Sequence, residues 1–294
     1  MMAVEDLLNR PEWFHTLWHD VSYLDHSQEC RDDSSYRELW KSPFARLIRV
    51  DEKFRIETPI GGVKPRGEYD ERAVFLGIAS GQPWFAVRVS SCQDAVDLRS
   101  LKASALEVQA ATVAQAILHW HASAKFCPTC SGTLHSVNGG FQAVCAECGR
   151  QHFPRTDPAV IVGVTDSQDR LLLAHHVAWA PKRVSILAGF VESGESAEQA
   201  CHREISEESN LDITHLGFFG TQPWPFPRSL MLGFTARTLN PDSLEPDGNE
   251  LEWARFYSRK EVITCHQGGK LLLPTNASLA SRIIHRWLVG KEPF

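Results

Sequence analysis

Three glutamates stand within five residues of one another in this chain, at Glu204, Glu207 and Glu208. The surrounding segment, Gly189–Leu211, reads GFVESGESAEQACHREISEESNL and contains one arginine, Arg203, and no lysine. A buried carboxylate without a partner is costly, and one arginine cannot neutralise three of them. Carboxylate oxygens are ligands that Mg²⁺ and Mn²⁺ favour. If these side chains point inward, the segment predicts a site for divalent metal ions.

The same segment predicts the helix that would position the carboxylates. Ser196 suits the N-cap, and Gln199 completes a capping box three residues later. The helix is expected to run to about Ser209. Asn210 then suits the left-handed position that follows a helix end, because asparagine tolerates positive φ better than most residues.

The helical periodicity sets the direction of the glutamates. At about 100° per residue, Glu204 and Glu208 fall inside the apolar arc of the helix, and Glu207 lies at its edge. The other members of this arc are Ala197, Ala200, Cys201 and Ile205. A solvated acidic face is the more common arrangement, but it would place the carboxylates opposite the apolar residues. The pattern therefore favours a metal site, with Cys201 assigned to packing.

Four of the eight cysteines form a second candidate metal site. They occur as two Cys-x-x-Cys pairs with fourteen residues between them: Cys127, Cys130, Cys145 and Cys148. This spacing suits a closed tetrahedral Zn²⁺ site of four thiolates, which is structural. A nucleic-acid-binding ribbon is the functional alternative, but the residues between the pairs include only His135 and no lysine or arginine. We expect zinc to supply folding energy to this short segment.

A third segment could bind a planar ligand. Thr221–Ser229 reads TQPWPFPRS, and its three prolines restrict the backbone around Trp224 and Phe226. Rigidly held aromatic rings suit stacking on a base. The alternative is a proline-rich loop in which the two rings only fill space. Its position soon after the acidic helix favours contact with substrate.

Composition limits the classes of protein that fit. The chain has 294 residues, 43% hydrophobic and 22% charged, which suits about two globular domains. A net charge of −6 argues against a general nucleic-acid binder. The N-terminal segment MMAVEDLLNRPEW lacks signal-peptide features, and no apolar run reaches membrane-spanning length. We therefore expect a cytoplasmic protein that does not contact membranes.

The elements that must position these residues are predicted as alternating strands and helices. Beyond residue 154 we expect a hairpin of Ala159–Thr165 with Arg170–Ala174, strands at Val184–Leu187, Leu230–Ala236 and Glu252–Tyr257, and a helix at Ser278–Leu288. Before residue 122 we expect strands at Phe44–Val50, Ala73–Ala79 and Trp84–Val89, a helix within Leu101–His121, and a turn at Asp32–Ser35. The predicted class is α/β, a mixed sheet between helices. Three domains result, at residues 1–122 (mixed α+β), 123–153 (zinc ribbon) and 154–294.

The acidic segment resembles the Nudix box. That signature reads Gly, five residues, Glu, seven residues, Arg-Glu, aliphatic, any, Glu-Glu, any, Gly, aliphatic. The chain matches it from Gly189 through Glu195 to Leu211, with Asn210 replacing the second glycine. The resemblance implies an α/β/α sandwich and a hydrolase dependent on Mg²⁺ or Mn²⁺.

TQPWPFPRS narrows the resemblance to the NADH diphosphatase subfamily, whose QPWPFPxS signature it matches at every fixed position. That subfamily also has a four-cysteine zinc ribbon upstream. The resemblance implies metal binding by Glu204, Glu208, the carbonyl of Ala188 and a later glutamate, matched best by Glu250, with Glu252 as the alternative. The implied substrate contacts are Phe153, Phe190, Gln222, Pro223, Trp224, Pro225, Phe226, Pro227, Arg228, Ser229 and Ala280.

The resemblance implies cleavage of the NAD(H) pyrophosphate to nicotinamide mononucleotide and AMP. NAD-capped RNA is a further candidate substrate because it contains the same bond. Glu207 or Glu208 would accept the proton from water, and Arg203 would orient the glutamates. A homodimer is implied as well. Two alternatives remain: a Nudix hydrolase of broader specificity, and a zinc-ribbon binding protein with an inactive Nudix domain, against which the intact REISEE argues.

Overall fold

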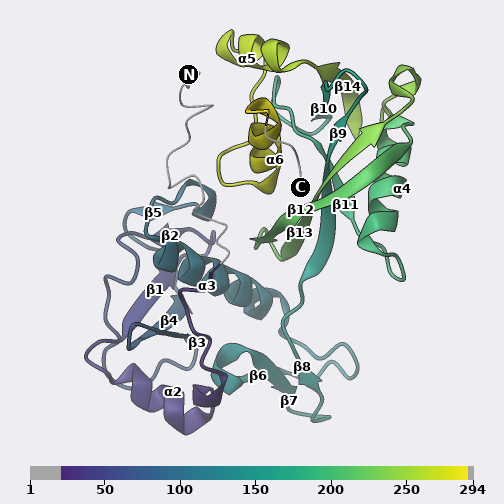
Figure 1. Cartoon of the computed structure of the whole chain (residues 1–294). Coiled ribbons are helices and arrows are strands. Elements are labelled where there is room, and N and C mark those ends of the chain that lie inside the picture. Colours follow the sequence, from purple (N-terminus) through teal and green to yellow (C-terminus); the bar gives the residue numbers. More distant parts are fainter. Residues whose placement is uncertain (1–20, 291–294) are drawn as a thin grey trace. The chain divides into compact units, whose positions relative to one another are not determined.

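The computed structural model describes residues 21–290 (Figure 1). The expectation that the chain lacks a signal peptide falls outside this range, as does the start of the predicted first domain. The described residues form two compact units. We call residues 21–156 with 223–228 the N-terminal unit, and residues 157–222 with 229–290 the C-terminal unit. Within the described range, no helix combines the length and apolar character needed to cross a bilayer.

The N-terminal unit contains a five-stranded sheet in the order β3-β4-β1-β2-β5. Its strands are β1 (Arg46–Val50), β2 (Ile56–Glu57), β3 (Val74–Ala79), β4 (Gln82–Arg88) and β5 (Ala95–Val96). β1 runs parallel to β4, and the other pairs are antiparallel. Phe75 and Phe85 are fully buried, and the Trp40 ring packs edge-on at 5.1 Å from Phe85. The strands predicted in this region are confirmed, with shifts of one or two residues.

Two helices accompany this sheet, α2 (Asp33–Trp40) and α3 (Ala105–Ser123). The turn predicted at Asp32–Ser35 is wrong, because Asp32 is the N-cap of α2 and accepts the N–H groups of Ser34 and Ser35. α3 begins later than predicted, where Ser104 and Glu107 form a capping box. Short 3₁₀ segments occur at Gln28–Cys30, Leu98–Ser100, Asn138–Gly140 and, in the C-terminal unit, Pro241–Ser243.

The cysteine-rich segment folds as a small antiparallel sheet in the N-terminal unit. Its strands are β6 (Leu134–Val137), β7 (Gln142–Cys145) and β8 (Gln151–His152). The sheet is too short to bury a core of its own, and both Cys-x-x-Cys turns lie at its end. The ribbon form expected for this segment is therefore present.

The C-terminal unit is built on a six-stranded mixed sheet. Its path runs β12-β13-β9-β10-β14, and β11 pairs with β9 off this path. The strands are β9 (Asp157–Thr165), β10 (Leu171–His176), β11 (Leu187–Phe190), β12 (Ile213–Trp224), β13 (Ser229–Thr238) and β14 (Leu251–Tyr257). β13 is parallel to β9, whereas β10 and β11 are antiparallel to it.

Helices cover both faces of this sheet (Figure 1). They are α4 (Ala197–Ser209), α5 (Arg259–Gln267) and α6 (Leu279–Leu288). Alternate side chains of β9 enter different cores: Val160 and Val162 pack with the buried side of α4, and Ile161 packs with α6. The predicted α/β/α sandwich with a mixed sheet is confirmed.

Some local predictions in this unit need correction. β9 and β10 are joined by a tight turn but pair only at Thr165 and Leu171. The rest of this edge of β9 pairs with β11, and β10 pairs along its length with β14. β11 starts at Leu187, so Ala188 and Gly189 lie inside the strand. Neither α5 nor the long β12 was predicted. The partners of a strand are set by distant segments, which periodicity does not reveal.

Candidate metal and substrate sites

The ends of α4 are defined by the residues predicted to define them. The Ser196 hydroxyl accepts the Gln199 N–H, and the Gln199 side chain accepts the Ser196 N–H, which completes the capping box. At the other end Asn210 has φ 55° and donates its backbone N–H to the Ser206 carbonyl. A helix with both ends fixed holds its carboxylates in one orientation.

The carboxylates of α4 differ in burial. Ala200, Cys201 and Ile205 are fully buried, and Glu208 is only 8% exposed on the same side of the helix. The Glu204 side chain is 13% exposed, whereas that of Glu207 is 62% exposed. The inward direction predicted for Glu204 and Glu208 is confirmed, while Glu207 faces solvent.

Arg203 is held by several partners. Its guanidinium donates to both carboxylate oxygens of Glu195, at 2.8 and 2.9 Å, and to the Phe190 carbonyl at 2.9 Å. It also donates to Glu204 at 2.9 Å and to Glu207 at 3.1 Å. Every donor is thereby directed at the protein, which suits an orienting role. Glu195 anchors this network. It is a fixed position of the motif, but no role was assigned to it from the sequence.

Gly189 allows the Glu204 carboxylate to reach the sheet. A Cβ atom at this position would lie 1.9 Å from the Glu204 carboxyl carbon, so any other residue would displace that carboxylate. The glycine therefore serves the close approach of Glu204, not an unusual φ. It brings Glu204 against β11 next to Ala188, an exposed residue of the strand whose carbonyl is the predicted metal ligand.

Burial and neighbouring charges raise the pKa of Glu208 to about 8. Burial is the largest cause, followed by the nearby carboxylates of Glu204, Glu250 and Asp247. Burial also raises the pKa of Glu204, although Arg203 opposes the shift. An oxygen-rich, anionic site of this kind fits a hard divalent cation, because such an ion would remove the repulsion.

The surroundings of Glu250 and Glu252 distinguish the two candidates for the later metal ligand. The Glu250 charge acts on both Glu204 and Glu208. Glu252 instead lies 3.4 Å from the Nε2 atom of His175, on β14. The arrangement favours Glu250 as the fourth protein ligand, and its metal-binding role stays a prediction.

Asp247 is a residue of this site that the sequence did not indicate. Its carboxylate accepts the N–H groups of Glu250 and Leu251, at 3.0 and 2.9 Å, and its own N–H donates to the Glu208 carbonyl at 3.2 Å. It thus ties the Glu250 loop to the end of α4. Only its position before the Asn-Glu pair could have suggested this, since the contact spans about forty residues.

The four predicted zinc ligands converge. The Sγ atoms of Cys127, Cys130, Cys145 and Cys148 all lie within 4.8 Å of one another. In the part of the chain that the structure describes, this is the one group whose ligand atoms meet so closely. Gly132 makes room for it, because a Cβ there would lie 2.8 Å from the Cys145 sulfur. The donor set fits a tetrahedral thiolate site.

Gln222 is committed to internal bonds. Its side chain is buried, donates to the Ala277 carbonyl at 2.6 Å, and accepts the Leu279 N–H at 2.6 Å. It therefore fixes the start of α6. Ala280 follows in that helix and is only 4% exposed, which leaves little surface for the predicted substrate contact.

The rest of the proline-rich segment belongs to the N-terminal unit. The Pro225 carbonyl accepts the Gln115 side chain at 3.1 Å, and Arg99 lies over the Phe226 ring at 4.9 Å. Trp224 packs edge-on against Phe226 at 4.8 Å. Pro223, Pro227 and Arg228 are exposed, and Ser229 begins β13. The two rings are thus partly engaged with each other, and their stacking on a base stays a prediction.

Two predicted stacking residues are open to solvent. Phe153 in the N-terminal unit is 56% exposed, and Phe190 in the C-terminal unit is 60% exposed. Single exposed apolar side chains are common on protein surfaces, so this exposure leaves both rings accessible without identifying a ligand, and their stacking role stays a prediction.

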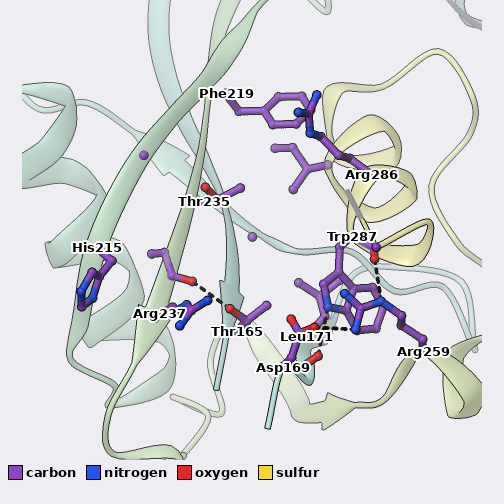
Figure 2. Close-up of a pocket in the computed structure, with 15 residues that line it drawn as sticks. Thr165, Asp169, Leu171, His215, Phe219, Thr235, Arg237, Arg259, Arg286 and Trp287 are labelled. Carbon is purple, nitrogen blue, oxygen red and sulfur yellow. Dashed lines mark hydrogen bonds and ion pairs between the residues drawn. The ribbon is translucent and has the colours of Figure 1, made fainter. Parts of the chain in front are cut away.

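The C-terminal unit also contains a pocket away from the glutamates. It has a volume of about 540 Å³ and is lined by residues of α6 and of strands β9, β12 and β13 (Figure 2). Arg259 at its rim binds Asp169 at 2.5 Å and the Trp287 carbonyl at 2.7 Å. Arg237, Arg286 and Phe219 also line it, but no residue of the acidic site does. The chemistry of the motif therefore lies outside this pocket.

Comparison with known proteins identifies the class. A NUDIX domain model matches residues 154–279. The NAD-capped RNA hydrolase NudC of Mycobacterium bovis (strain BCG / Pasteur 1173P2) is 37% identical over 274 residues, which cover 83% of this chain and 86% of that protein. The chain therefore belongs to the Nudix hydrolase family, whose members act on pyrophosphate bonds.

Two further relatives bear the same functional name. The NAD-capped RNA hydrolase NudC of Mycobacterium tuberculosis (strain ATCC 25618 / H37Rv) is 36% identical over the same shares of both chains. The human NAD-capped RNA hydrolase NUDT12 is 35% identical over 196 residues, which cover 62% of this chain and 42% of that protein.

Proposed function

We propose that this protein hydrolyses the pyrophosphate bond of NAD(H), giving nicotinamide mononucleotide and AMP, and that it removes NAD caps from RNA by the same reaction. One observation carries the proposal: the chain resembles NAD-capped RNA hydrolases over 83% of its length and combines the acidic helix with TQPWPFPRS. The first feature suits a diphosphate, and the second suits the dinucleotide.

The acidic site supports hydrolysis by charge. Glu204, Glu208, Glu250 and the Ala188 carbonyl would hold Mg²⁺ or Mn²⁺. When bound, such ions neutralise a diphosphate bridge and lower the pKa of a coordinated water. Arg203 keeps Glu204 in place through the bonds described above. Glu207 or Glu208 would accept the proton of the attacking water.

The ribbon would serve stability. We assign Zn²⁺ to Cys127, Cys130, Cys145 and Cys148, supported by the convergence of their sulfurs. We also retain the division into residues 1–122, 123–153 and 154–294, a homodimeric assembly and a reducing, cytoplasmic location. All cysteines within the described range are free of disulfides, which agrees with that location.

A substrate panel tests the proposed function. Purified protein would be incubated with NADH, NAD⁺, ADP-ribose, a nucleoside diphosphate sugar and NAD-capped RNA, with and without Mg²⁺ or Mn²⁺, and the products identified by mass. We expect metal-dependent release of nicotinamide mononucleotide from NADH and NAD⁺. Equal turnover of all the diphosphates would instead support the Nudix hydrolase of broader specificity.

A further inference from the structure

A basic and aromatic surface borders the acidic site of the C-terminal unit. We call it the Trp179 surface; its members are His176, Trp179, Lys182, Arg183 and Lys270. Lys182, Arg183 and Lys270 are exposed, and the two rings are half-buried. None of these residues has a role in the Nudix motif or in TQPWPFPRS.

The ring at the centre of this surface is held on several sides. Trp179 stacks on His176 with centroids 5.6 Å apart and an interplanar angle of 30°. Arg183 lies over the Trp179 ring at 5.1 Å, and His175 meets the ring edge-on at 6.5 Å. These contacts restrict the Trp179 ring, so little conformational entropy is lost when a ligand packs against it.

Backbone pairing gathers the three cations. The Leu272 N–H donates to the Lys182 carbonyl at 2.7 Å, and an isolated parallel β-bridge pairs the backbones of Arg183 and Leu272. Lys270 lies two residues before Leu272 on the same strand-like segment. Two distant segments thus place exposed cations together in a chain whose net charge is −6.

The Trp179 surface is connected to the candidate metal ligands from two directions. Val177, two residues before Trp179 in the chain, donates its N–H to the Glu250 carbonyl at 2.9 Å. Beyond Arg183 the chain enters β11, which carries Ala188. The segments that form the surface therefore adjoin those that carry the candidate metal ligands.

The chemistry of the surface selects its ligand. Cations attract phosphodiesters, and an aromatic face stacks on any base, which is how single strands are bound without sequence preference. The large apolar side chains exposed on these two segments are Val177 and Leu272, at 47% and 48%. Three cations stand beside them, which suits a phosphodiester chain better than an apolar partner or a bilayer.

We propose that the Trp179 surface binds the first nucleotides of the RNA that follows the NAD cap. The inference rests on the proposed function and extends it, because it separates recognition of the RNA from cleavage of the dinucleotide. Free NADH lacks the nucleotides that follow the cap. We therefore expect the surface to affect capped RNA and not NADH.

The test compares two substrates with one set of variants. For Trp179→Ala we expect kcat/KM on an NAD-capped single-stranded RNA of about ten nucleotides to fall about tenfold, because one stacked base contributes about 1–3 kcal/mol. Turnover of NADH should be unchanged. Trp179→Phe, which keeps a ring, should restore most of the activity on RNA.

A second pair of variants tests the charges, and Lys182→Ala does so while leaving the Arg183 contact with the Trp179 ring in place. Lys182→Ala and Arg183→Ala should each lower the slope of log kcat/KM against log salt, measured on capped RNA, by about 0.7. Lys260→Ala is the matched control, since Lys260 is an exposed lysine of α5 outside the surface, and it should leave the slope unchanged.

The experiment distinguishes failure of the surface assignment from failure of the proposed function. Equal losses on NADH and capped RNA, or no loss on capped RNA with any variant, would overturn the assignment of this surface while leaving the proposed function intact. A wild-type protein that cleaves NADH but not capped RNA would also overturn it. Absence of NADH cleavage by the wild type would overturn the proposed function itself.

Discussion

The two candidate metal sites of this molecule are built on opposite plans. The four cysteines come from two short turns, about fifteen residues apart, and their sulfurs already lie within 4.8 Å of one another. The glutamates come from a helix and from a loop some forty residues further on, and their carboxylates approach less closely. Thiolates in a closed set leave no position for substrate, whereas spaced carboxylates do.

This difference explains how each site is stabilised. The ribbon has little core, so the metal must replace burial as the source of folding energy. The acidic site stands on a sheet packed by helices on both faces, and its side chains are positioned without an ion by Arg203, Gly189 and Asp247. Loss of its metal would unfold the ribbon, whereas loss of metal from the acidic site would abolish activity and leave the fold intact. The predictions below test that contrast.

The largest effect is expected from Cys127→Ser. Structural zinc contributes on the order of 10 kcal/mol to the folding of small ribbons, so loss of one thiolate should unfold residues 123–153. Zinc content by mass spectrometry under native conditions should fall from one ion per chain to nearly none, and protease should cut within the ribbon. Cys92→Ser, a thiol outside the cluster, is the control and should keep the zinc.

Glu208→Gln should have the complementary result. Loss of one carboxylate ligand should lower kcat on NADH by at least about a hundredfold, as removal of a charge-stabilising group does in other active sites. Zinc content and protease resistance should match the wild type. Glu252→Gln is the matched control, because Glu252 neighbours Glu250 on the sequence but contacts His175. Full activity of Glu208→Gln would contradict the metal-site assignment.

The same contrast shows what the sequence reveals. The ends of α4, the inward glutamates and the convergence of the cysteines were all predicted, because each depends on one helix or on two turns about fifteen residues apart. The role of Asp247, the pairing of β9 with β11 and the internal bonds of Gln222 were not. Each of these joins segments about twenty-five or more residues apart, where only packing in three dimensions decides the partner.

Stability should depend on pH through Glu208. Its pKa is raised from 4.5 to about 8 in the folded protein, chiefly by burial. A carboxyl with a raised pKa contributes stability that is present below about pH 4.5 and is lost as the pH rises towards 8. We compare zinc-loaded proteins without Mg²⁺ or Mn²⁺. As the pH rises through this range, Glu208→Gln should become more stable relative to the wild type.

The expected gain at pH 8 is on the order of a few kcal/mol, or several degrees in Tm. Differential scanning calorimetry at pH 5 and pH 8 measures it as the difference between variant and wild type, which cancels groups common to both. Added Mg²⁺ should raise the Tm of the wild type at pH 8 and that of the variant much less. A constant difference at both pH values would argue that Glu208 is already ionised in the folded protein.

The smallest effect is expected from Asn210→Gly, which restores the glycine of the Nudix signature. Glycine would relieve the cost of φ 55°, which is small for asparagine. It would also remove the bond from the Asn210 side chain to the Ser243 carbonyl at 3.2 Å, worth about 1 kcal/mol. The two changes nearly cancel, so the free energy of unfolding should change by less than about 1 kcal/mol. Because Glu204 and Glu208 are held by Arg203, Gly189 and Asp247, kcat on NADH should stay within about twofold of the wild type. A large loss of activity would mean that the carboxylates depend on the exact end of α4, and that the acidic site is as locally determined as the ribbon.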